Sequence, residues 1–121
     1  MIITENKYKI SYNIPVKAYN YYKENNISFS EIANIGLNIL RTKASYKEIE
    51  EMKKYLHKNI KGERTITTIK LTKSNYQFVI QHSYRQDLLH FAFITGNKIY
   101  NQNHKKENKK IEKELYKKWF I

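Results

Sequence analysis

The chain has 121 residues, a length that suits one ordinary domain and is too short for most multidomain enzymes. It contains 23 Lys and Arg against 11 Asp and Glu, and the net charge of +12 is typical of proteins that meet nucleic acid or an anionic membrane surface. The lack of cysteine excludes a disulfide-stabilised extracellular scaffold, and the apolar runs are too short for a transmembrane span or a signal peptide. We therefore expect a soluble, intracellular, basic protein.

The charge does not by itself identify a nucleic-acid-binding protein. The sequence is rich in Lys, Ile, Asn and Tyr and poor in Arg, a bias that AT-rich coding alone generates. A solvated basic surface would have the same net charge. The function therefore has to be inferred from where the charged residues lie.

Residues 9–14 alternate between polar and apolar side chains, which predicts a half-buried β-strand. Pro15 ends this strand and can occupy the first position of a helix. The spacing of the apolar residues after it predicts a short helix over 16–25. The predicted buried face of the strand carries Ile10, Tyr12 and Ile14, and the opposite face carries Lys9, Ser11 and Asn13.

A second helix is predicted to begin at Ser28, because Glu31 lies three residues further on and completes a capping box. Its apolar stripe consists of Ile32, Ile35, Gly36, Ile39 and Leu40. A third helix is expected over 44–59, with Tyr46, Ile49, Met52 and Leu56 on one face.

Residues 64–71 alternate between polar and apolar side chains in the same way as residues 9–14. The segment after them repeats the order of a short helix followed by a second helix, which indicates an internal repeat. An offset of 57 aligns the two strands and first helices, and an offset of 56 aligns the second helices, with Gly36 on Ala92. The second strand is predicted to bury Thr67, Ile69 and Leu71 and to expose Arg64, Ile66, Thr68 and Lys70. A polar break from Asn101 precedes a last helix, which either packs on the core or serves self-association on DNA.

A single alternating strand cannot stand alone, because its backbone groups need a partner and one face must be buried. We therefore expect a mainly α-helical fold in which the two strands pair as an antiparallel β-ribbon over the helices. Such a ribbon fits the DNA major groove, where Lys, Asn, Ser, Thr and Ile contact base edges and thymine methyls. The competing interpretation is that any half-buried strand has a polar outer face. The predicted base-reading residues are Lys9, Ser11, Asn13, Ile66, Thr68 and Lys70.

Helix N-termini are the predicted phosphate sites, because their amides and dipole attract anions. The first such site consists of Ser28, Phe29 and Ser30. In the second repeat Ser83, Tyr84 and Arg85 hold the corresponding place, with Ser83 and Gln86 as a capping pair and Arg85 as a clamp on phosphate. Arg64 is expected to contact phosphate from the edge of the ribbon. Plain helix capping explains the same serines and is compatible with this role.

The order of residues in KYKISYNIPVKAYNYYKENNISFSEIANIGLNIL resembles the ribbon-helix-helix family of DNA-binding regulators. The resemblance covers residues 7–41 well and residues 64–100 more weakly, since Thr72 replaces the proline there. It implies a tandem pseudo-dimer in one chain, similar to tandem regulators of archaeal viruses, which would place the protein in the host cytoplasm. The expected parts are a first unit (1–43), a linker helix (44–62), a second unit (63–101) and a basic amphipathic C-terminal helix (102–121). One chain should then read a non-palindromic site.

Catalysis has little support in the sequence, so we expect no enzyme, no metal and no cofactor. The four histidines form no close ligand pair, Asp87 is the single Asp, and no Gly-rich phosphate loop exists. Neither a small-molecule substrate nor a membrane is an expected partner. Two alternatives to the tandem regulator stay open: an antitoxin-like homodimer that uses the first unit alone, and a basic adaptor or inhibitor that binds an acidic protein.

Overall fold

The computed structural model describes residues 8–59 and 62–104, and over this part of the chain it contains five helices and two strands. The predicted combination of a mainly helical fold with one two-stranded antiparallel sheet is confirmed. The sequence predicts a polar break from Asn101, but α5 continues through its first four residues, to His104. The rest of the predicted C-terminal segment, residues 105–121, lies outside the described residues. The elements are β1 (Lys9–Pro15), α1 (Val16–Glu24), α2 (Phe29–Lys43), α3 (Tyr46–Asn59), β2 (Arg64–Lys70), α4 (Lys73–Ile80) and α5 (Arg85–His104).

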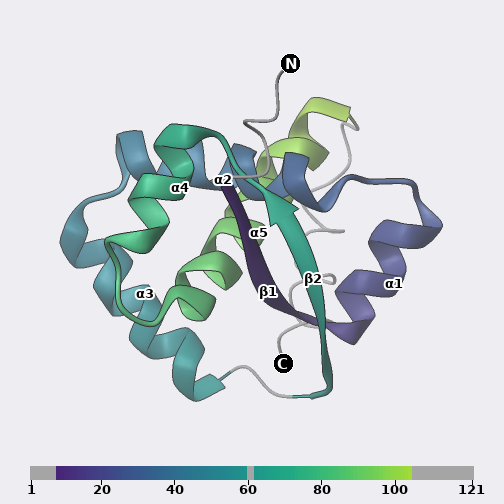
Figure 1. The fold of residues 1–121 in the computed structure, drawn as a ribbon, viewed down its shortest axis with the longest axis horizontal. Helices are drawn as coiled ribbons and strands as arrows, with labels where there is room; N and C mark the ends of the chain where they lie inside the picture. The colour runs from purple at the N-terminus through teal and green to yellow at the C-terminus, as the bar shows by residue number, and fades with distance from the viewer. Residues whose placement is uncertain (1–7, 60–61, 105–121) are drawn as a thin grey trace.

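Strands β1 and β2 form an antiparallel ribbon in which Ser11 lies opposite Thr68. Pairing continues beyond both ends, since the Leu71 amide donates to the Tyr8 carbonyl at 2.9 Å and the Val16 amide donates to the Glu63 carbonyl at 3.0 Å. The ribbon lies across the front of the molecule with α2 and α5 behind it, α1 on one side and α3 and α4 on the other (Figure 1). One face of the ribbon is thus packed on helices.

The inner face of the ribbon forms part of the core, as its alternation predicts. Tyr12, Ile14 and Ile69 are fully buried, and Leu71 continues this face beyond the strand. Helices α2 and α5 cross beneath the ribbon in direct backbone contact. A Cβ atom built on Gly36 would overlap the Ala92 carbonyl, and one on Gly96 would overlap the Ile32 carbonyl. Glycine at these two positions therefore permits the close approach of the helices.

Short-range signals start most of the helices. The Ser28 hydroxyl accepts from the Glu31 amide at 3.2 Å, which confirms the predicted cap of α2. Ser45 and Glu48 form a reciprocal capping box at α3, a Ser-x-x-Glu pattern that is readable in the sequence although we did not predict it. Thr72 caps α4 and directly precedes it, as Pro15 directly precedes α1. Side-chain caps thus define three helix starts.

Two predicted helix faces need correction. Tyr46, expected in the buried face of α3, is 72% exposed, whereas Lys53 is buried beside Ile49 and Leu56. Lys53 is buried because it has polar partners on the loop after α4. In α2 the buried face is rotated from the predicted apolar stripe toward the contact with α5. Ile35 and Ile39, which belong to that predicted stripe, are therefore only half-buried. The buried residues of α2 are Ile32, Ala33, Gly36, Leu37 and Leu40.

Candidate functional site

The outer face of the ribbon is the candidate functional site. The ribbon places Lys9 opposite Lys70, Ser11 opposite Thr68 and Asn13 opposite Ile66. All six side chains are exposed, and Ile66 is 69% exposed. The structure therefore brings together on one surface all six residues that the alternation of the two strands assigned to the outer face.

This surface is basic. Arg64 is exposed at the end of β2, two register positions beyond Ile66, and the two strands contain no Asp or Glu. The positive charges of Lys9 and Lys70 lie together at the opposite end of the ribbon. Between them the surface offers hydroxyl and amide groups, which both donate and accept hydrogen bonds.

The inner side of the ribbon is fixed by a neutral polar contact. The Tyr12 hydroxyl and Nδ1 of His90 share a hydrogen bond of 2.7 Å inside the core. Burial lowers the pKa of His90 to about 3, with a further contribution from the nearby charge of Arg64, and burial raises the pKa of Tyr12 well above its ordinary value. Tyr12 also stacks on Phe93, with ring centroids 4.6 Å apart. These contacts hold β1 against α5.

Both long edges of the ribbon are bound by the start of a helix. At the β2 edge, the Lys70 amide donates to the Ser30 hydroxyl at 2.9 Å, and Asn34 donates to the Lys70 carbonyl at 3.0 Å. At the β1 edge, the Asn13 amide donates to the Gln86 side-chain carbonyl at 2.8 Å, and the Gln86 amide group donates to the Ser11 carbonyl at 3.0 Å. These bonds set the position of the helix N-termini relative to the outer face.

Helix α2 begins where the sequence predicts, directly after Ser28. Its first main-chain bond joins the Ile32 amide to the Ser28 carbonyl at 3.2 Å, so the amides of Phe29 and Ser30 precede the hydrogen-bonded part of the helix. Such amides lie at the positive end of the helix dipole. The Ser30 hydroxyl, in contrast, accepts the bond from the ribbon that fixes this helix.

The N-terminus of α5 differs from the prediction by one residue. Tyr84, not Ser83, directly precedes the helix; it has a φ of 53°, and its carbonyl accepts from the amides of Asp87 and Leu88. The predicted Ser83–Gln86 capping pair is wrong, because the Gln86 side chain binds β1. Arg85 is exposed as the first residue of the helix, and its guanidinium donates to the Ile80 carbonyl at 3.0 Å. The left-handed backbone of Tyr84 gave no signal in the sequence.

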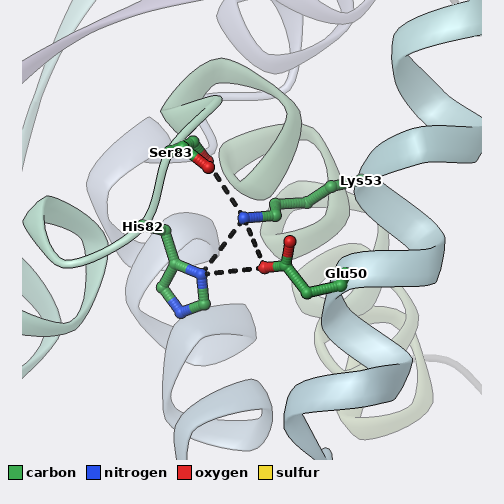
Figure 2. Close-up of polar contacts among 4 residues, drawn as sticks. All are labelled: Glu50, Lys53, His82 and Ser83. Carbon is green, nitrogen blue, oxygen red and sulfur yellow. Dashed lines mark hydrogen bonds and ion pairs between the residues drawn. The ribbon is translucent and has the colours of Figure 1, made fainter.

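The linker helix α3 holds the loop before α5 through Lys53, which is 3% exposed (Figure 2). Its ammonium group donates to the Ser83 carbonyl at 3.0 Å and lies 2.6 Å from the Glu50 carboxylate and 3.2 Å from Nδ1 of His82. The hydrogen bond from Lys53 lowers the pKa of Glu50, and burial together with the Lys53 charge lowers the pKa of His82. Sequence reasoning missed this cluster because Glu50 and Lys53 have the spacing of an ordinary surface pair.

A second contact of α3 lies nearby, where Nδ1 of His57 is 3.0 Å from the Asp87 carboxylate. Over residues 8–59 and 62–104, no three His, Cys, Asp or Glu side chains converge as metal ligands. No helix in that part of the chain is both long enough and apolar enough to cross a bilayer. Comparison with protein-family models, curated proteins and solved structures finds no match to this chain.

Proposed function

We propose that this protein is a sequence-specific, double-stranded DNA-binding transcriptional regulator that inserts its β-ribbon into the major groove. The observation that carries the proposal is the outer face of the ribbon, where six exposed side chains of base-reading type lie on one element of the right width. Arg64 at the edge and the N-termini of α2 and α5 beside the ribbon would contact phosphates.

We further propose that the chain is a tandem ribbon-helix-helix pseudo-dimer. Under the 57-residue offset Ser11 corresponds to Thr68, and these two residues lie opposite each other in the ribbon. Under the 56-residue offset Gly36 corresponds to Ala92, and Gly36 packs against the Ala92 carbonyl. A residue meets its own counterpart on a two-fold axis. Both contacts therefore support an approximate two-fold axis through the ribbon and the crossing of α2 and α5.

The bonds at the ribbon edges support the same relation. Ser30 accepts from the Lys70 amide, and Gln86 accepts from the Asn13 amide. Gln86 follows Ser30 by 56 residues, and Lys70 follows Asn13 by 57, the two offsets found in the sequence. The two repeats thus make reciprocal contacts, each using the start of its second helix to bind the strand of the other. Because both strands belong to one chain, the ribbon does not require a second copy.

The proposal is tested by comparing Asn13→Ala with Arg85→Ala in binding to a selected duplex and to random duplex. Asn13→Ala is expected to relax base preference at one position by about 1–3 kcal/mol, because it removes a contact to a base edge. Arg85→Ala is expected to weaken binding to all sequences alike and to flatten the salt dependence, because it removes a phosphate contact. Isothermal titration or filter binding at two salt concentrations measures both effects.

Two outcomes would contradict the proposal. Equal loss of specific and non-specific affinity in Asn13→Ala would exclude base reading by this residue. Absence of duplex binding at low and moderate salt would exclude the DNA-binding function and would favour a basic adaptor for an acidic protein. Affinity that falls by about 10²-fold or more between the two salt concentrations is the result expected for several phosphate contacts.

A further inference from the structure

The two ends of the ribbon are chemically different. Among the base-facing pairs, Lys9 faces Lys70 at one end of the ribbon, and Asn13 faces Ile66 toward the other end, where Arg64 follows on the same face. Ser11 and Thr68, two similar hydroxyl side chains, form the pair between them. The ribbon surface is therefore polarised along its length about a nearly symmetric centre.

Neither end is explained by the stability of the fold. Like charges directly opposite each other on antiparallel strands are destabilising, and β1 and β2 provide no carboxylate to offset the Lys9–Lys70 pair. Ile66 is an apolar residue in the solvent face of a strand and stays 69% exposed. When residues at both ends of an exposed surface destabilise the fold or add nothing to its stability, they indicate that the surface has a role in binding.

The chemistry of the two ends matches different base pairs. Lysine donates to O6 and N7 of guanine, so the Lys9–Lys70 end suits guanines. Asparagine pairs in bidentate fashion with N6 and N7 of adenine, and an aliphatic side chain contacts the thymine methyl group. The Asn13–Ile66 end therefore suits an A·T pair, since it offers both groups side by side.

We propose that the ribbon binds its duplex in one fixed orientation, with guanines under the Lys9–Lys70 end and A·T under the Asn13–Ile66 end. This inference rests on the proposed function and specifies its substrate. The two ends are four residues apart along β1. At about 3.3 Å per residue and about 3.4 Å per base pair, they read positions about four base pairs apart.

Selection of binding sites from a random duplex pool tests the base composition proposed for the two ends of the DNA site. The expected site is non-palindromic, with G·C preferred at one end and A·T preferred about four base pairs away. Replacing that A·T by G·C should weaken binding by the full chain about 5- to 150-fold. A palindromic site, or equal preference at both ends, would overturn the inference while leaving the DNA-binding function in place.

The double variant Asn13→Lys/Ile66→Lys tests which residues cause the difference. It places Lys pairs at both ends, and we expect it to select guanines at both ends and to lose the discrimination against G·C. Lys17→Ala is the matched control, because it removes an exposed cation two residues after Pro15 without changing either base-facing pair; it should keep the wild-type consensus. An unchanged consensus in a double variant with native circular dichroism would overturn the inference. If wild-type protein selects no sequence at all, the proposed function itself fails.

Orientation is measured directly with a cleavage reagent. The chain has no cysteine, so a single Lys73→Cys substitution, three residues after Lys70 and exposed, accepts a tethered iron chelate. Cleavage is expected on the guanine side of the selected site alone. Glu63→Cys, next to Arg64 at the other end of the ribbon, should reverse the pattern. Equal cleavage on both sides from either position would show that the duplex binds in both orientations and would contradict the proposal.

Discussion

The starts of α2 and α5 occupy corresponding places beside the ribbon but are stabilised in different ways. Helix α2 begins with a local cap, the Ser28 hydroxyl on the Glu31 amide. Helix α5 begins after the left-handed residue Tyr84, and its preceding loop is held by Lys53 of the linker helix α3. The first start depends on residues within a few positions of it, whereas the second depends on a side chain 30 residues away.

This difference indicates what the linker helix does in the fold. Besides joining α2 to β2, α3 contributes Lys53 to the Ser83 carbonyl and His57 to the Asp87 carboxylate. Both contacts are to the segment that positions α5 under the ribbon. The β2–α5 part of the fold is therefore completed by α3, and perturbations of α3 should affect it more than the β1–α2 part.

The largest expected effect comes from breaking the close contact between α2 and α5. Gly36→Ala should lower the free energy of unfolding by about 3 kcal/mol or more, because the added methyl group meets the Ala92 backbone, which cannot move aside as a side chain can. Chemical denaturation followed by circular dichroism measures the change. Lys98→Ala, an exposed position of α5, is the control and should change it by less than about 0.5 kcal/mol. Similar stability of the two variants would exclude the tight crossing.

A smaller effect is expected from removing the contact that α3 makes to the loop before α5. Lys53→Met keeps the aliphatic volume but leaves the Ser83 carbonyl and the Glu50 carboxylate without the ammonium group, and should cost about 2 kcal/mol. Hydrogen exchange should increase at the start of α5 and not at the start of α2. Lys54→Met, exposed on the same helix, should have little effect. Equal exchange in the two variants would contradict the role of Lys53.

The smallest effects distinguish the two helix starts themselves. Ser28→Ala should cost about 1 kcal/mol, because the Glu31 amide loses its capping acceptor. Ser83→Ala should cost less than about 0.5 kcal/mol, because Lys53 binds the Ser83 carbonyl, which the substitution keeps. Thermal unfolding of both variants against wild type gives the comparison. A larger loss in Ser83→Ala than in Ser28→Ala would show that the second helix is capped by the serine after all.

Short-range patterns predicted much of this fold because short-range forces determine those parts. Alternation assigned every outward residue of both strands, and the Ser28–Glu31 spacing gave the start of α2. The errors occurred where a distant partner decides the outcome. Gln86 has the spacing of a capping residue, but its side chain binds β1. Lys53 is a charged residue of the type normally found on the surface, but it is buried. No pattern within a few residues records such contacts.

Connection of the two strands in one chain has a consequence for how the ribbon assembles. Strands on separate subunits would meet by a second-order process, so that the ribbon would be lost on dilution. Here α1, α2, α3 and the loop after α3 connect β1 to β2, and closing this connection carries an entropy that does not depend on protein concentration. A single molecule therefore holds a complete ribbon however dilute the protein is.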